Sequence, residues 1–120
     1  MKDNFYSISH LERGEGSVSC TLHYNAAHDI FNGHFPGNPI VPGVCTMAIV
    51  KELLEDAFQL KLLLKESKAV KFLGLINPAM SPALKLLWKE EDGQVSAIAT
   101  LQDGVTSLFK MSGLYVPAIQ

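Results

Sequence analysis

The order of apolar and polar residues predicts a two-stranded hairpin near the start of the chain. From Val18 to Tyr24 the two kinds of residue alternate, which is the period of a strand with one buried face. An earlier strand is expected over Phe5–Leu11, and Gly14-Glu15-Gly16 supplies a turn between them.

A long apolar helix is predicted after a loop that is dense in glycine and proline. The loop covers Asn25–Gly43, and from Val44 to about Phe58 there is neither residue. Apolar positions in this stretch cover a broad helical arc. The first half, Val44–Val50, is apolar on nearly every side, so we expect other structure to surround it. Charged residues then mark where the helix emerges into water: Lys51, Glu52, Glu55 and Asp56.

The remainder of the chain predicts strands that are separated by turns. A linker is expected around Lys61–Ser67, and Asp92-Gly93 and Asp103-Gly104 are turn signals. The expected strands are Ala69–Ile76, Leu84–Lys89, Val95–Leu101 and Val105–Tyr115. The elements together predict an α+β fold, in which a hairpin and a three- or four-stranded antiparallel meander form a curled sheet wrapped around one central helix.

Composition limits the size and the partners of this fold. The 120 residues suffice for one domain, which we assign to residues 1–120. Apolar residues make up 48% and charged residues 18%, so an apolar subunit interface is expected. The net charge of −2, with no long run of either sign, disfavours nucleic-acid binding through a basic face.

Targeting signals and disulfides are not expected. The first residues, Met1–Asn4, are not followed by the apolar segment of a secretory signal. Residues 30–50 carry no formal charge, but three prolines and three glycines interrupt them, so no membrane span is expected. Cys20 and Cys45 fit neither a disulfide framework nor a zinc motif. We expect a cytoplasmic protein with two inert, buried thiols.

The most informative segment runs from Phe31 to Val44. It holds His34 in a loop stiffened by prolines, and it delivers the chain to the start of the apolar helix at Gly43. The free N–H groups of a helix start favour a carbonyl oxygen that gains negative charge. A base beside such amides is the basis of proton abstraction next to a thioester or a similar carbonyl.

This segment resembles the signature of a known enzyme family. Gly33-His34-Phe35-Pro36-Gly37-Asn38-Pro39 and Pro42-Gly43-Val44 are similar to the motif of the 3-hydroxyacyl-acyl carrier protein dehydratases, the FabA/FabZ group of hotdog-fold proteins. The resemblance implies that His34 removes a proton from C2 of the acyl chain and that the Gly43 amide polarises the thioester carbonyl. It also implies a homodimer or higher oligomer with sites at the subunit interface. The substrate-binding positions that it implies are Phe35, Gly37, Pro42, Val44, Met47 and Ala48.

One position departs from the family pattern. The family has a glutamate or aspartate fourteen residues after the histidine, where it handles the departing hydroxyl, and this chain has Ala48 there. Glu52 lies one helical turn further on and is a possible substitute acid, as is a bound water. The Pro-Gly-Asp turn of the family is also absent around Pro78–Ala83, so the chain is a divergent member.

Three functions remain open. The first is a dehydratase of 3-hydroxyacyl thioesters of an acyl carrier protein or coenzyme A, in fatty-acid or related lipid or polyene biosynthesis. The second is an impaired subunit that forms a heterodimer with a related chain supplying the acid. The third is a hotdog thioesterase or acyl-binding module, because one fold hosts several chemistries. No cofactor is expected, and the spacing of His23, His28, Asp29 and His34 matches no metal-ligand pattern, so no metal is expected either.

Overall fold

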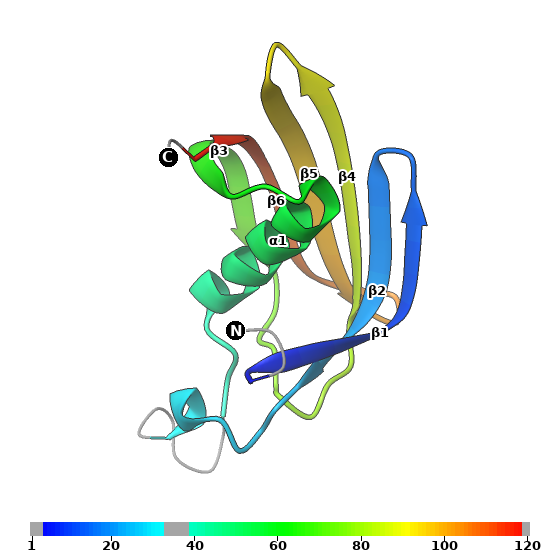
Figure 1. Ribbon diagram of the computed structural model, residues 1–120. Helices are drawn as coiled ribbons and strands as arrows, with labels where there is room; N and C mark the ends of the chain where they lie inside the picture. Colours follow the sequence, from blue (N-terminus) through cyan, green and yellow to red (C-terminus); the bar gives the residue numbers. More distant parts are fainter. Residues whose placement is uncertain (1–3, 33–38, 119–120) are drawn as a thin grey trace.

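Six antiparallel strands and one α-helix build the part of the chain that the computed structural model describes, residues 4–32 and 39–118 (Figure 1). The sheet has the strand order β1-β2-β4-β5-β6-β3. The elements are β1 (Tyr6–Gly14), β2 (Ser17–Tyr24), the 3₁₀ turn η1 (Asp29–Phe31), α1 (Gly43–Phe58), β3 (Leu62–Phe72), β4 (Ala83–Glu91), β5 (Gln94–Asp103) and β6 (Thr106–Pro117).

The predicted hairpins form where the alternation and the turn residues indicated them. In β2 the inward residues Val18, Cys20 and Leu22 are buried, and Ser17 pairs with Gly14 of β1 across the turn. The β4–β5 turn uses Asp92 and Gly93, both with positive φ, which is the backbone shape that tight hairpins require. The α+β prediction is therefore confirmed.

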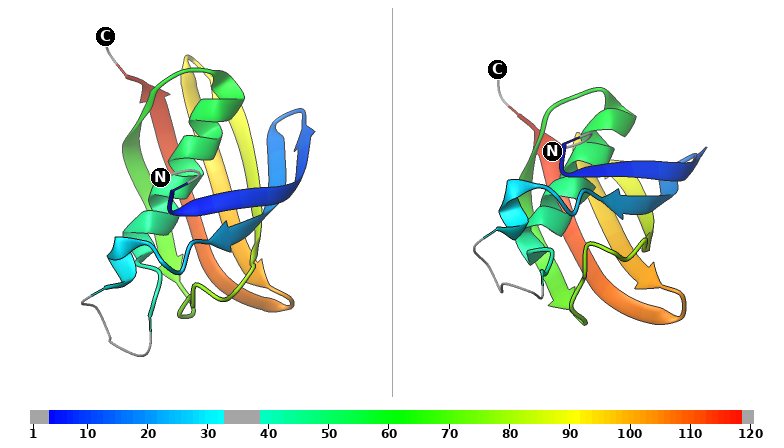
Figure 2. Two further views of the ribbon diagram at one scale, coloured as in Figure 1. Left: turned by 60° about the horizontal axis from the view of Figure 1, so that its bottom comes forward. Right: turned by 90° about the horizontal axis from the view of Figure 1, so that it is seen from below.

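Helix α1 packs on the concave face of the sheet, which curves around it (Figure 2). Its buried residues Ile49, Val50 and Leu54 are at most 1% exposed and belong to the same core as the inward side chains of the strands. Removal of this apolar surface from water is the main force that holds the helix on the sheet. The predicted helix boundaries are confirmed to within one residue.

The start of α1 is less enclosed than the sequence indicates. Val44 is 73% exposed, and Met47 and Ala48 are only partly buried. The expectation that Val44–Val50 is surrounded on every side is therefore wrong. The sheet covers one side of the first turn only, so an apolar strip of α1 faces outward.

The strand before β4 differs from the prediction. Residues 62–72 form β3, whereas the sequence pattern indicated a linker over most of this range and a strand at Ala69–Ile76. The register of β3 against β6 shifts twice, between Leu64 and Glu66 and again between Ser67 and Ala69, so the strand has no regular alternation to recognise.

Strand β3 lies at an edge of the sheet. It pairs with β6 and not with the next strand in sequence, β4, so only β4, β5 and β6 form a meander. The other side of β3 has no strand neighbour within the described residues, and its side chains Leu63, Leu64 and Phe72 are exposed. An exposed apolar edge strand offers backbone groups that another strand can pair with.

Candidate active site

The first turn of α1 presents free backbone amides. Pro42 precedes it in an extended conformation and provides no side-chain cap, and no acidic residue lies in the first turn. The Cys45 amide donates to the Pro42 carbonyl at 3.0 Å, whereas the Gly43 amide makes no hydrogen bond within the described residues. Among the described residues, the positive end of the helix dipole therefore has no compensating anion in the first turn.

An aromatic ring lies against Gly43 at the start of α1. A Cβ atom built on Gly43 would lie 2.8 Å from Cζ and 2.9 Å from Cδ1 of Phe72, closer than real contacts allow. Phe72 stacks at a tilt on Phe109, 5.5 Å away, and is itself 58% exposed. The glycine thus lets the ring of an edge-strand residue close over the helix start.

Two apolar pockets open on either side of Val44. The first, which we call the Pro42 groove, has a volume of about 320 Å³. The second, the Ala48 pocket, has a volume of about 300 Å³. Residues that line the Pro42 groove include Pro42, Gly43, Val44, Phe72, Leu75 and Leu108. The Ala48 pocket is lined by Val44, Met47, Ala48, Lys51, Leu64 and Tyr115.

These pockets gather all the described residues that the sequence assigned to substrate binding: Pro42, Val44, Met47 and Ala48. Pro42, Gly43 and Val44 share the first pocket, and Val44, Met47 and Ala48 share the second. Burial raises the pKa of Tyr115, so its phenol stays protonated. The Ala48 pocket is lined by one ammonium and one phenol and by no carboxylate among the described residues.

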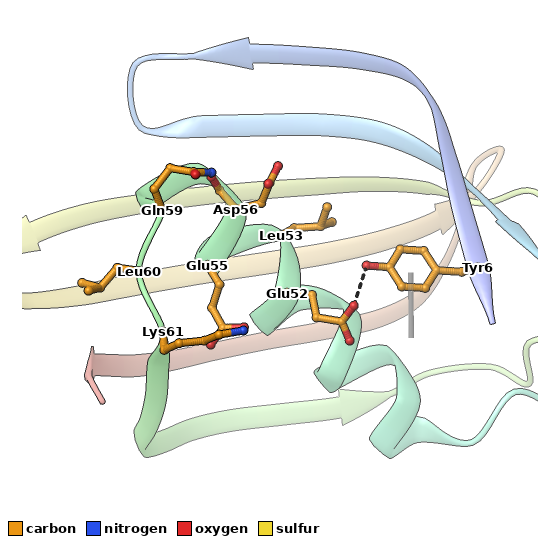
Figure 3. Close-up of a pocket in the computed structure, with 8 residues that line it drawn as sticks. All are labelled: Tyr6, Glu52, Leu53, Glu55, Asp56, Gln59, Leu60 and Lys61. Atoms are coloured by element: carbon orange, nitrogen blue, oxygen red, sulfur yellow. Dashed lines mark hydrogen bonds between the residues drawn. The ribbon is translucent and has the colours of Figure 1, made fainter. Parts of the chain in front are cut away.

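Glu52 faces a different part of the molecule. Its Oε1 accepts a hydrogen bond of 3.2 Å from the phenol of Tyr6 on β1 (Figure 3). It lines a third pocket, of about 380 Å³, between β1 and the second half of α1. Glu52 therefore does not join Ala48 in its pocket in this structure.

The described residues on either side of the sequence motif make contacts with the rest of the fold. Phe31, at the end of η1, is buried against Phe5 with 5.7 Å between the ring centroids. Beyond the loop, the Val41 amide donates to the Ile76 carbonyl at 2.8 Å. The predicted residues His34, Phe35 and Gly37 lie outside the described residues.

The other candidate groups have structural partners. His28 Nδ1 accepts a hydrogen bond of 3.0 Å from the Ile30 amide, and His23 Nε2 lies 2.6 Å from the Ser9 hydroxyl. Burial raises the pKa of Cys45, and it raises that of Cys20 to about 11, so both thiols are protonated at neutral pH. The prediction of two buried thiols is confirmed.

Sequence patterns missed several residues of these pockets, among them Lys51, Leu64, Phe72 and Tyr115. Lys51 was detectable, because it follows Val44, Met47 and Ala48 at helical spacing on one face of α1. Leu64 and Phe72 come from β3, which follows α1 directly, and Tyr115 comes from β6, the last strand of the sheet in sequence. Only the strand order brings them to the helix start, and no local pattern encodes it.

Comparison with known proteins finds a family whose sequence model matches most of the chain. A sequence model of the ApeI-like family, described as ApeI dehydratase, matches residues 10–108. The chain belongs to the ApeI-like dehydratase family. The matched range begins within β1, includes the histidine motif and all of α1, and ends at the third residue of β6.

Curated relatives of this ApeI-like chain are dehydratases. FabZ, the 3-hydroxyacyl-[acyl-carrier-protein] dehydratase of Pediococcus pentosaceus, is 38% identical over 74 residues, which are 60% of this chain and 46% of that protein. The corresponding enzyme of Lactobacillus helveticus is 36% identical over 74 residues, 60% of this chain and 47% of that protein. The ApeI-like chain thus spans about half the length of the curated relatives it matches.

Solved structures confirm the hotdog-type fold of the ApeI-like chain. The dehydratase heterocomplex ApeI:P from Xenorhabdus doucetiae contains a chain that superposes with a TM-score of 0.75 at 21% identity, covering 91% of this chain and 96% of that one. Among the residues that the structure describes, no helix has the length and apolar character needed to cross a bilayer.

Proposed function

We propose that this chain is a subunit of a 3-hydroxyacyl-thioester dehydratase of fatty-acid or related lipid or polyene biosynthesis. The thioester is carried by an acyl carrier protein or coenzyme A. Membership of the ApeI-like dehydratase family supports the reaction class. The observation that carries the proposal is the uncapped start of α1 at Gly43, which opens onto an apolar groove.

The proposed reaction is an elimination of water. His34 takes the proton from C2, next to the thioester carbonyl, and the negative charge that develops on the carbonyl oxygen is stabilised by the Gly43 N–H. The electron pair then forms the C2–C3 double bond, and the C3 hydroxyl leaves with a proton from an acid. The acyl chain would lie along the apolar pockets beside Val44.

The acid of this reaction is proposed to come from a second chain. No carboxylate of the described chain lines the Ala48 pocket, and the Glu52 carboxylate is hydrogen-bonded to Tyr6 in another pocket. Leu64 of β3 lines the Ala48 pocket, so this pocket lies beside the edge strand that has no further strand neighbour among the described residues. A related chain paired along β3 would reach it.

The heteromeric arrangement has a counterpart among the structural relatives, because the ApeI:P protein is a dehydratase heterocomplex. Under this proposal the chain contributes the base and the oxyanion amide, and the related chain contributes the carboxylate. A homodimer that uses Glu52 or a bound water would instead work without a second kind of chain.

The test measures formation of the enoyl thioester from a 3-hydroxyacyl thioester, by the chain alone and with a related chain copurified from its host. We expect slow turnover alone, since acid catalysis is worth about 10²- to 10⁴-fold, and full turnover in the complex. His34→Ala should abolish both activities. His23→Ala is the matched control, because His23 lies on β2 beside Ser9 and outside the pockets described above.

Two results would contradict the proposal. Release of free thiol without loss of water would identify a thioesterase. Full turnover by the isolated chain, lost in Glu52→Gln, would show that Glu52 is the acid and that no second chain is needed.

A further inference from the structure

The outer face of the sheet, opposite α1, carries a pattern that the proposed reaction does not use. In β4, Leu84 and Leu86 are buried beneath the helix, so Lys85 and Leu87 point to the other face, which no helix of the described chain covers (Figures 1 and 2). The strand register then assigns the neighbours of these two residues on the same face.

One transverse row of this face is basic. Lys85 pairs with Thr100, Thr100 with Lys110, and Lys110 with Lys71, so three lysines line up across β4, β5, β6 and β3. We call this set the lysine row. Lys71 and Lys110 are direct cross-strand neighbours, an arrangement that repels. None of the three forms an ion pair within the described residues, so an anion from outside would relieve the repulsion.

The adjacent row is apolar or small. Leu87 pairs with Ile98, and they are 42% and 53% exposed. Ser17 continues the row on β2, and Ser112 and Ala69 continue it on β6 and β3. We call this set the apolar row. It crosses five strands and is about 19 Å long at the usual strand spacing.

We propose that this face binds an acidic amphipathic helix of another protein, laid across the strands. A helix of about 13 residues has the length of the apolar row, and at about 10 Å across it fits beside the lysine row. Its apolar stripe would cover Leu87 and Ile98, and carboxylates along one edge would pair with the lysines.

The acidic residues of the face favour a helix over a flat anionic membrane. Glu12 pairs with Ser19, which continues the lysine row at its far end. On the opposite side of the apolar row, Glu66 pairs with Leu114, and Lys89 lies in the same row on β4. A flat anionic surface would meet both carboxylates. A narrow helix passes between them. A second copy of this chain, placed back to back, would bring two lysine rows together.

The experiment measures fluorescence anisotropy of a labelled helical peptide with glutamates along one edge and a leucine and alanine stripe beside it. The control peptide has lysine in place of glutamate. We expect binding of the acidic peptide only, weakened about ten-fold or more by Lys110→Glu and by Leu87→Ser. Lys61→Glu, the same charge change beyond the end of α1, should leave binding within about two-fold.

Several outcomes would overturn the proposal. These are no binding of the acidic peptide, equal binding of both peptides, or equal weakening by Lys61→Glu. Binding of anionic phosphatidylglycerol vesicles in place of the peptide would assign the face to a membrane. A change of oligomeric state in Lys110→Glu, seen by sedimentation, would assign it to a second copy.

Discussion

At the scale of single residues, the described site lacks a carboxylic acid because position 48 is alanine. Its methyl group lines an apolar pocket that has space for a longer side chain, with Lys51 and Tyr115 as the polar neighbours. A carboxylic acid at this position is the group that general acid catalysis of the proposed elimination requires. The chemistry missing from the chain is thus one functional group at one position.

We expect Ala48→Glu to make the isolated chain a competent dehydratase. Turnover of a 3-hydroxyacyl thioester should rise by about 10²-fold or more, because a positioned general acid contributes on that order. Ala48→Gln, which fills the same space without an acidic proton, should show no gain. Unchanged turnover in Ala48→Glu would mean that the pocket serves another reaction.

The buried thiol of Cys20 predicts how stability depends on pH. Burial raises its pKa from 9.0 to about 11 in the folded chain, so the unfolded chain loses this proton first as the pH rises. The stabilisation is complete below about pH 9 and is lost as the pH approaches about 11. Urea unfolding across this range should show a falling free energy of unfolding. The fall should be smaller in Cys20→Ala, and an equal fall would contradict the assignment.

Helix α1 combines two environments at the scale of elements. Val50 is 1% exposed against the sheet, whereas Val44 is 73% exposed beside the two apolar pockets. A buried valine at position 50 therefore contributes to stability, whereas the exposed valine at position 44 contributes to the candidate site.

A matched pair of substitutions separates these two environments. Val50→Ala removes two buried methyl groups and should lower the free energy of unfolding by about 2 kcal/mol. Val44→Ala should change it by less than about 0.5 kcal/mol, because the side chain is mostly in water. Thermal unfolding of both variants measures the difference. Equal losses would show that Val44 is covered in the native assembly.

The elements that the sequence predicted are those with regular patterns. The alternation of β2 and the apolar run of α1 were readable because one face of each is buried in the core. Strand β3 was not readable from the sequence. Its two register shifts remove the alternation of apolar and polar residues, and its position at the edge leaves most of its side chains exposed. In the site, Pro42, Gly43 and Val44 were found as neighbours in one motif. Phe72 was missed because it reaches Gly43 only through the fold.

At the scale of the whole molecule, the exposed edge of β3 is where we expect a second chain to pair. A strand of 11 residues with apolar side chains and no outer neighbour in the described chain is a surface for strand pairing. Pairing there would cover Leu63 and Leu64 and enclose the Ala48 pocket. Assembly and activity are therefore expected to depend on the same edge.

We expect Leu63→Asp to convert the assembly to single chains in sedimentation experiments and to reduce dehydratase turnover together with it. A buried carboxylate without a partner disfavours association strongly. Leu11→Asp, the same change at an exposed leucine of β1, should leave the assembly intact. Single chains with undiminished turnover would separate the site from the edge.

The strand order also affects how the molecule is made. β3 precedes β4, β5 and β6 in the chain, yet its one partner in the described sheet is β6, the strand of that sheet that is synthesised last. Until residues 106–117 emerge, the nascent chain holds the leucine-rich segment 62–64 without its native neighbour. Pairing between strands distant in sequence slows folding, and until it forms the apolar side chains of this segment are exposed to aggregation. The edge proposed for assembly is thus also a strand whose first pairing waits until every other strand of the described sheet has been synthesised.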